Sequence, residues 1–287
     1  MLDEAGGAHM FPPELVALTR HDMVRALPPA LFEQILTQHL YRYLDFTTKL
    51  ELLVVNKTVL AIANGGVDLH LPDEMVFDAY KIYCDEAYHA LFSADLIRQV
   101  HARTGLPPQL DERPYFLTQL RRLQESVEPQ LRALVELLFV VCSETLISAT
   151  LAEVPDDPRV DTAVRRSIRD HAADERRHHA YFAAFLKFLW YEMDSGQRRA
   201  MARLLPDLLL AFLRPDLPAI RCELAGYGFN RDQIEQILAE VYDDGTVNAY
   251  ARDTSRQTMR YFAAVGVLED QAACNRFAEL GLLEEGR

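Results

Sequence analysis

Long stretches without glycine or proline constrain this chain more than any other feature of its sequence. Between these breakers, apolar residues recur at steps of three and four, which is the period of an amphipathic helix. No stretch shows a convincing two-residue alternation typical of a strand. The longest segments would extend about 50 Å at ~1.5 Å per residue, too long for ordinary surface helices. The pattern therefore predicts an all-α protein built on a bundle of long helices.

Four long segments are expected to form the bundle, with shorter helices before and after it. The long segments run over residues 30–64, 73–104, 114–155 and 158–194. The shorter helices are expected at residues 13–26, 197–213, 230–243, 247–265 and 270–280, with a proline-punctuated turn at 214–218. We therefore divide the chain into an N-terminal helical segment (1–29), a bundle (30–195) and a C-terminal helical extension (196–287).

Composition excludes several classes of partner. The 30 Lys and Arg against 43 Asp and Glu give a net charge of −13, which repels phosphate backbones and anionic lipid head groups. No run reaches the ~18 apolar residues of a membrane span, and the start of the chain has no basic and apolar signal region. The four cysteines form no C-x-x-C pair, so neither a zinc knuckle nor a disulfide framework is expected. We expect a cytoplasmic protein that binds neither nucleic acid nor membrane.

The pattern D-E-x-x-H occurs twice, at residues 85–89 and 174–178. Glu and His three positions apart on a helix differ by about 60° and point the same way. Each motif can therefore offer one carboxylate and one imidazole to a common point. Because roughly 0.7 E-x-x-H pairs are expected by chance in a chain of this composition, the spacing alone proves little.

Two further carboxylates sharpen the case, because they stand in apolar surroundings. Glu51 lies within LELLVV, and Glu144 lies within LLFVVCSETLIS with no Lys or Arg inside one helical turn. Burying an ionised carboxylate costs several kcal/mol unless a cation or strong donors compensate. One known bundle arrangement places a Glu from each of two helices and an E-x-x-H from each of the other two around two metal ions.

Three more residues extend this candidate site. His171 stands four residues before Glu175, on the same helix face, where a third imidazole can reach the metals. Asp85 and Asp174 are candidates to hydrogen-bond an imidazole N–H, either of their own motif's histidine or of the opposite one. Oxygen-rich ligands mixed with imidazole suit iron first, with manganese as the alternative, and suit zinc less well.

The ordered set resembles the p-aminobenzoate N-oxygenase family. The resemblance rests on the H-x-x-x-D-E-x-x-H run at 171–178, the DEAYHA run at 85–90, and the glutamates at 51 and 144, and it covers about residues 30–195. Members are ferritin-like diiron proteins, typified by the arylamine oxygenases of aureothin and chloramphenicol biosynthesis. The resemblance implies a ferritin-like four-helix bundle with these ligands for two Fe ions: Glu51, Glu86, His89, Glu144, His171, Glu175 and His178.

The resemblance also implies an activity. In this family the diferrous cluster reduces the co-substrate O₂ to a bridging peroxo species, which oxygenates an amine nitrogen to hydroxylamine, nitroso or nitro, in secondary metabolism. It further implies a small-molecule amine substrate, free or carrier-bound, and a homodimer. An external reductase must supply electrons, because the chain shows no flavin or nicotinamide fingerprint.

The same residues are also compatible with other functions and with purely structural roles. A heme-oxygenase-like diiron oxidase, acting on an amino acid or fatty acid, also uses a late H-x-x-x-[DE]-x-x-H helix but does not need Glu51. A non-catalytic, ferritin-like iron-binding protein is the alternative from a different class. Glu51 is also compatible with an ordinary amphipathic helix, since Lys49 and Lys57 lie nearby, and His171 with a solvated helix face.

Overall fold

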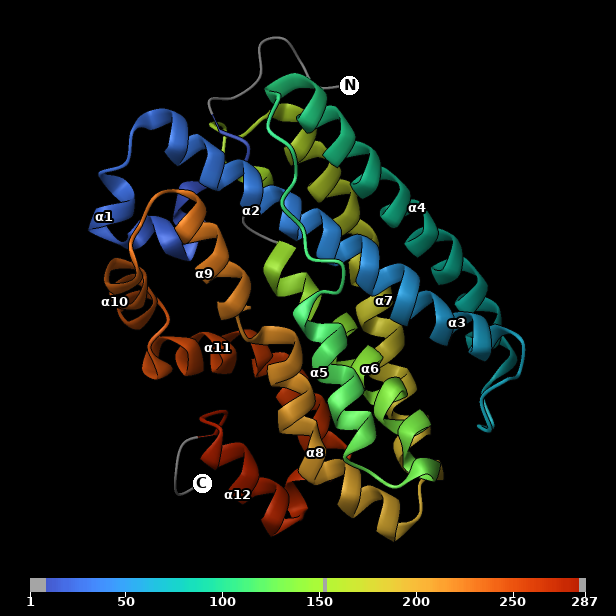
Figure 1. The fold of residues 1–287 in the computed structure, drawn as a ribbon. Helices are drawn as coiled ribbons and strands as arrows, with labels where there is room; N and C mark the ends of the chain where they lie inside the picture. Colours follow the sequence, from blue (N-terminus) through green and yellow to red (C-terminus); the bar gives the residue numbers. More distant parts are fainter. Residues whose placement is uncertain (1–8, 152–153, 284–287) are drawn as a thin grey trace.

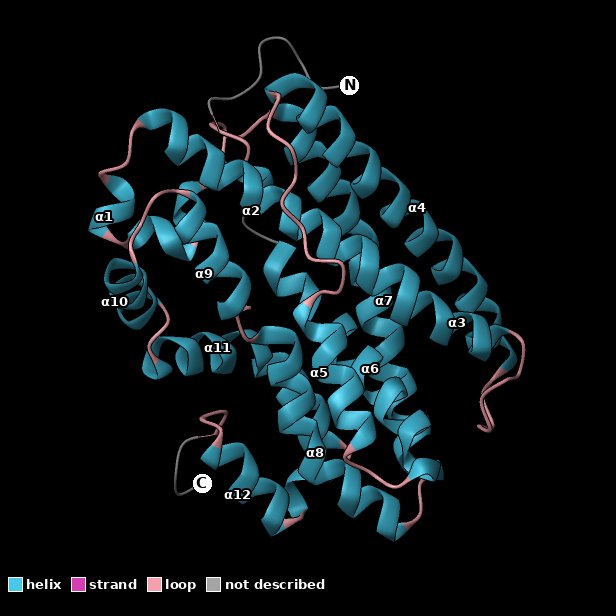
Figure 2. Ribbon diagram, viewed as in Figure 1, coloured by secondary structure: helices cyan, strands magenta, loops and turns pink. Residues whose placement is uncertain are grey.

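The computed structural model describes residues 9–151 and 154–283, and it is helical through almost all of that range. Within these residues it contains no strand beyond an isolated bridge between His9 and Val160. Figure 2 accordingly shows helices joined by short loops. The all-α prediction is confirmed.

Four rods form the bundle that the sequence predicts. They are α2 (Pro29–Leu50) continued by η3 (Glu51–Val55) and α3 (Asn56–Ala63), then α4 (Asp73–Thr104), α6 (Arg132–Leu151) and α7 (Thr162–Glu192). The first rod packs against α4, α6 packs against α7, and α4 and α7 close the bundle (Figure 1). This arrangement is that of a ferritin-like bundle.

The first rod contains a feature that the sequence does not predict. Its helix is continuous over the expected range, but η3 is a π turn in which the Asn56 N–H bonds to the Glu51 carbonyl, five residues back. One extra residue in a turn shifts the directions of the side chains around it. Glu51 and Val54 are buried, whereas Leu52 and Leu53 are about half exposed.

Two of the expected helices are broken in the structure. The segment 114–155 is split into α5 (Tyr115–Glu125) and α6, because Pro129 has no N–H to donate and restricts the residue before it. The expected helix at 13–26 is instead a series of single turns. The short turns of the described chain are η1 (Pro13–Leu15), η2 (Ala17–Arg20), α1 (Asp22–Arg25), η4 (Pro129–Leu131), η5 (Val154–Asp156) and η6 (Val267–Glu269).

The C-terminal extension contains one more helix than the sequence predicts. Its helices are α8 (Ser195–Leu213), α9 (Leu217–Gly226), α10 (Arg231–Val241), α11 (Asp244–Ala264) and α12 (Gln271–Glu279). The unpredicted helix is α9, where Asp216 caps the first turn by accepting from the Ala219 N–H and Pro218 lies within that turn.

The extension lies against one side of the bundle. In Figure 1, α9 to α12 lie to the left of the bundle helices. Helix α8 packs on α5 and α6, and α11 packs on α6. None of the described helices combines the length and apolar character that crossing a membrane requires.

Candidate metal centre

All seven proposed ligands lie in the interior of the bundle. The first rod contributes one carboxylate, α4 an E-x-x-H pair, α6 one carboxylate, and α7 two imidazoles and a carboxylate. Each of these residues is at most 1% exposed: Glu51, Glu86, His89, Glu144, His171, Glu175 and His178. Four separate rods therefore bring acids and imidazoles into one dry region.

Both E-x-x-H motifs have the geometry that their spacing predicts. His89 Nδ1 lies 3.1 Å from Glu86 Oε2, and His178 Nδ1 lies 3.2 Å from Glu175 Oε1. In each motif the imidazole and the carboxylate thus project together from one helix face. The same ring nitrogen, Nδ1, faces the interior in both.

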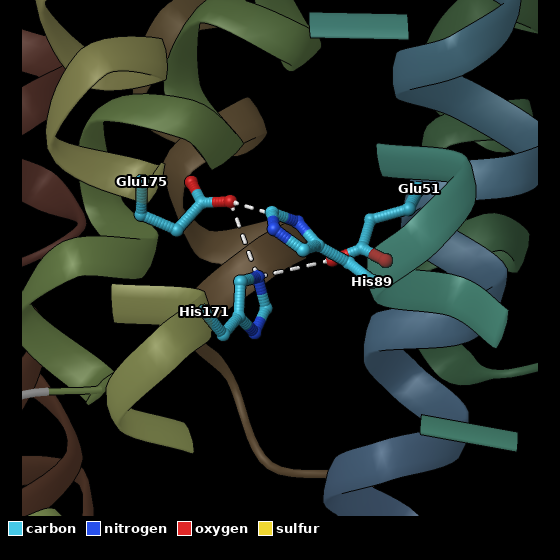
Figure 3. A group of neighbouring side chains, drawn as sticks. All are labelled: Glu51, His89, His171 and Glu175. Carbon is cyan, nitrogen blue, oxygen red and sulfur yellow. Dashed lines mark hydrogen bonds and ion pairs between the residues drawn. The ribbon is translucent and has the colours of Figure 1, made fainter. Parts of the chain in front are cut away.

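A first cluster joins the first rod to α4 and α7 (Figure 3). His171 Nε2 lies 3.1 Å from both Glu51 Oε1 and Glu175 Oε1, and His89 Nδ1 lies 3.7 Å from that same Glu175 oxygen. The four side chains can each offer a ligand atom to one ion, since these atoms lie within 4.8 Å of one another. His171 therefore lies among the candidate ligands and does not face solvent.

A second cluster lies beside the first and shares two of its residues. It consists of Glu86, His89, Glu175 and His178, again with ligand atoms within 4.8 Å of one another. His178 Nδ1 lies 2.9 Å from Glu86 Oε1. Glu144 stands at its margin, with Oε2 3.9 Å from His178 Nδ1. The structure thus brings six of the seven predicted residues together as two adjoining clusters, and it places the seventh, Glu144, at the margin of the second.

Asp85 and Asp174 each contact the histidine of the opposite motif. Asp174 Oδ2 lies 3.1 Å from His89 Nε2, and Asp85 Oδ2 lies 3.2 Å from His178 Nε2. A carboxylate that accepts from Nε2–H leaves the Nδ1 lone pair directed inward, where a metal ion binds. The choice that the spacing left open is therefore resolved in favour of crossed pairs.

Arg177 bridges the two aspartates, and the sequence pattern did not predict this bridge. Its Nη2 donates to Asp174 Oδ1 at 2.8 Å and to Asp85 Oδ2 at 3.1 Å. The three-residue spacing from Asp174 predicts only the first contact. The second depends on how α4 and α7 are placed relative to each other, which the spacing does not encode.

The pKa values of the buried glutamates show how unfavourable their negative charges are without a metal ion. Burial raises the pKa of Glu51 well above its usual range, and the neighbouring carboxylates of Glu86, Glu175 and Glu144 raise it further. Burial likewise raises the pKa of Glu144, again with help from Glu175 and Glu86. Without a metal ion, protons therefore compensate the negative charge at these two positions.

The neighbouring imidazoles also compensate the negative charge of the glutamates. Burial disfavours the ionised form of Glu175, but hydrogen bonds from two neighbouring imidazoles outweigh it and lower the pKa of that carboxyl. Burial also lowers the pKa of His178, but hydrogen bonds and charges from Glu175 and Glu86 outweigh it and raise the pKa to about 12. In the metal-free protein, the positive charge of a protonated His178 thus partly neutralises the neighbouring carboxylates.

The donor set fits a pair of metal ions. Five buried carboxylate oxygens accept no well-aligned hydrogen bond within the described residues, although Glu51 Oε1 and Glu86 Oε1 each lie near an imidazole nitrogen, at 3.1 Å and 2.9 Å: Glu51 Oε1 and Oε2, Glu86 Oε1, Glu144 Oε2 and Glu175 Oε2. Such orphaned acceptors are rare in protein interiors and call for an explanation such as an ion. Carboxylate and imidazole donors without thiolate are typical of iron or manganese sites.

Two aromatic side chains next to the clusters were not singled out from the sequence. The Phe92 ring lies 5.6 Å from the His89 ring and 6.0 Å from the His171 ring. The Tyr43 hydroxyl is buried without a hydrogen-bond partner among the described residues. Burial raises the pKa of Tyr43 far above its usual range, and the charges of Glu51 and Glu175 add to this effect, so the hydroxyl stays protonated.

Comparisons with known proteins identify a family and a relative that this sequence resembles. The sequence profile of the p-aminobenzoate N-oxygenase AurF family matches residues 2–266. A protein of Streptomyces thioluteus named 4-aminobenzoate N-oxygenase is 27% identical over an alignment of 254 residues, and the match covers 85% of this chain and 73% of that protein. The family match extends past residue 195, so it includes most of the C-terminal extension as well as the bundle.

Proposed function

The chain belongs to the p-aminobenzoate N-oxygenase family, and from this membership we propose that its seven converging side chains bind two iron ions that serve the N-oxygenation of an aromatic amine. The family is one of metal-dependent oxygenases, so the chain is an oxygenase enzyme. The substrate class is taken from the name of the Streptomyces relative, 4-aminobenzoate N-oxygenase. Residues 30–195 act as the catalytic bundle in this proposal, with 1–29 and 196–287 packed around it.

The observation that carries the proposal is the set of orphaned carboxylate oxygens in a dry interior. Two ions placed between the carboxylates would remove their mutual repulsion, which explains why four acids from four rods are buried together. When bound, iron supplies the electrons and the Lewis acidity with which O₂ is activated. The reducing equivalents come from an external electron donor.

The chain's own residues have separate tasks in this scheme. Glu51, Glu86, Glu144 and Glu175 neutralise the ions, and the imidazoles of His89, His171 and His178 complete the ligand set. Asp85 and Asp174 fix the tautomer and direction of the two E-x-x-H imidazoles. The surrounding apolar core excludes water from the centre, which protects a reactive oxidant from side reactions.

The position of Glu51 favours this function over a heme-oxygenase-like oxidase. That alternative does not need Glu51, whereas Glu51 Oε1 lies 3.1 Å from His171 Nε2 inside the first cluster. A ferritin-like storage role is also less well supported, because the family match indicates an oxygenase. Manganese in one or both positions remains compatible with the same donors.

Metal loading followed by turnover tests the proposal. The protein is loaded with Fe(II) under anaerobic conditions, the bound iron is counted, and 4-aminobenzoate, O₂ and a chemical reductant are added. We expect two irons per chain and 4-hydroxylamino-, 4-nitroso- or 4-nitrobenzoate by mass spectrometry. A His178→Ala variant is the inactive control, and an exposed His70→Ala variant is the matched active one. Fewer than two irons per chain, or oxidation at carbon only, would overturn the proposal.

A homodimer is part of the same proposal. Of the ten large hydrophobic side chains exposed on the described residues, eight lie on η3, α3 and α4, which pack against one another: Leu52, Leu53, Leu60, Phe77, Tyr80, Tyr83, Tyr88 and Leu91. Exposed apolar side chains that gather on neighbouring helices are typical of an interface. A second copy is the occupant we propose, because a two-fold axis buries this face on both copies at once. We retain the sequence-based expectation of a cytoplasmic enzyme as part of the proposal.

A further inference from the structure

Two polar contacts join α11 of the C-terminal extension to the bundle at the level of the metal centre. Thr258 Oγ1 lies 2.9 Å from Thr145 Oγ1 and 3.3 Å from the Thr145 carbonyl oxygen. The Tyr261 hydroxyl lies 2.8 Å from His179 Nε2. Both contacts come from one helix that lies outside the four rods.

The partners of these contacts directly follow two proposed metal ligands. Thr145 is the residue after Glu144 on α6, and His179 is the residue after His178 on α7. Thr258 and Tyr261 are three residues apart, so they project from the same face of α11. One helix face thus contacts both of the rods that carry Glu144 and His178, whose side chains approach to 3.9 Å.

The threonine pair lies in a dry interface. Thr258 is fully buried and Thr145 is 3% exposed. A buried hydroxyl costs free energy unless it is paired, whereas valine would fill the same volume without this requirement. The Thr145 hydroxyl donates to the Val141 carbonyl at 2.7 Å, so it can accept from Thr258, and the chain of hydrogen bonds is complete. Such a complete network fixes the register of α11 on α6.

The second contact holds the ring of His179. This ring is partly buried, and its Nδ1 has no hydrogen-bond partner within the described residues. The Tyr261 hydroxyl is therefore the polar contact that fixes the ring on the α11 side. The neighbouring residues Ser255 and Phe262 of α11 are also fully buried, so this helix face has little freedom to shift.

We propose that Thr258 and Tyr261 are positioning residues that set the separation of Glu144 and His178, and thereby the affinity of the ion bound by the cluster around Glu86 and His178. The inference rests on the metal assignment of the proposed function. It gives the C-terminal extension a role in the centre without contributing a ligand. In the cluster that contains Glu51 and His171, neither of these two ligands is adjacent in sequence to a residue that Thr258 or Tyr261 contacts.

A Co(II) titration of the full-length protein tests the inference, with visible absorption and metal analysis reporting each ion as it binds. We expect the wild-type protein to bind two ions. Thr258→Val and Tyr261→Phe should retain the first affinity and weaken the second about tenfold, as loss of supporting hydrogen bonds at metal sites does. Thr258→Ser, which keeps the hydroxyl, should restore the second ion.

A matched control separates positioning from a general loss of stability. Thr254 lies one turn earlier on α11, is only partly buried, and makes no side-chain hydrogen bond within the described residues. Thr254→Val should therefore leave both affinities unchanged. A purely structural role of Thr258 would lower the melting temperature of the metal-free protein and weaken both ions together, which contradicts the inference.

A failure of the positioning role and a failure of the proposed function give different experimental results. If the wild-type protein binds two ions and both Thr258→Val and Tyr261→Phe keep the wild-type ratio of affinities, the positioning role is wrong and the proposed function stands. If the wild-type protein does not bind two ions, the proposed function is wrong and the inference falls with it. Tyr261→Phe keeps the ring in place, so the test does not depend on the folding of the threonine variant alone.

Discussion

His89 Nε2 lies 3.1 Å from Asp174 Oδ2, although the two residues belong to different helices and to different copies of the D-E-x-x-H motif. The reciprocal contact joins His178 to Asp85 at 3.2 Å. The two motifs are thus interlocked across the α4–α7 interface. Each aspartate holds an imidazole from outside while that imidazole's other nitrogen faces the carboxylates inside. A substitution in one motif should therefore disturb the orientation of the histidine ligand in the other motif.

Replacing Asp174 tests this interlock. Asp174→Ala should weaken metal binding about 10- to 100-fold, because His89 loses the acceptor that fixes its tautomer and orientation. Asp170→Ala, which removes an exposed carboxylate one turn earlier on α7, is the matched control and should have little effect. Affinity is measured by competition with a chromophoric chelator. Equal affinities in the two variants would show that the crossed pairs do not support the ligands.

Metal affinity should rise with pH. The pKa values of Glu51 and Glu144 are raised in the metal-free protein by burial and by neighbouring carboxylates, so these groups hold protons where ordinary glutamates are ionised. Incoming ions displace those protons and the extra proton of His178, up to about three per chain, and binding is therefore favoured at higher pH. Proton release is measured by calorimetry in buffers of different ionisation enthalpy. Glu144→Gln should reduce the released protons, and an unchanged count would contradict the assignment.

Glu144→Gln should also stabilise the metal-free protein. Because its folded-state pKa is raised, the stability that goes with the protonated Glu144 is present below the unfolded-state pKa and is lost as pH rises through the folded-state pKa. At neutral pH the neutral amide avoids this loss, and we expect a gain of about 1–3 kcal/mol. Chemical denaturation in the presence of a chelator measures it.

The matched control for this stability prediction is Glu136→Gln. Glu136 lies on the same helix, its side chain is 18% exposed, and it pairs with Lys57 and accepts from Gln124. Glutamine can still accept hydrogen bonds there, so Glu136→Gln should change stability by less than about 1 kcal/mol. Adding Fe(II) should stabilise the wild-type protein more than Glu144→Gln, since the variant has lost a ligand. A destabilised metal-free Glu144→Gln variant would show that this carboxylate is not under electrostatic strain.

The features of the site that could be predicted from the sequence depend on the spacing of residues within one helix. Periodicity predicts the four rods, and the E-x-x-H spacing predicts that Glu86 and His89 share a face. The apolar residues flanking Glu144 predict its burial. These inferences hold within a single helix, and the structure confirms them, except that the segment 114–155 is divided into α5 and α6.

The parts that sequence missed depend on relations between helices or on small backbone changes. The π turn beginning at Glu51 adds one residue to a turn, which leaves no mark on composition and little on periodicity. The crossing of Asp85 to His178, and the bridge through Arg177, depend on the axial shift between α4 and α7. Pro215 and Pro218 predict a turn, whereas the structure forms helix α9 there, because proline is well tolerated in a first helical turn.

The exposed apolar face of α3 and α4 is expected to form the dimer interface. Phe77 and Leu60 are 61% and 42% exposed on two helices that pack together, so Phe77→Glu and Leu60→Glu should place unpaired charges in the proposed dimer interface and shift the protein towards monomers. Light scattering coupled to size-exclusion chromatography measures the mass, and bound iron should stay at two per chain because neither residue contacts the clusters. Tyr191→Glu is the control, since Tyr191 is 81% exposed on α7, outside this face. A wild-type protein that elutes as a monomer, or charged variants that remain dimeric, would show that the face does not join two copies.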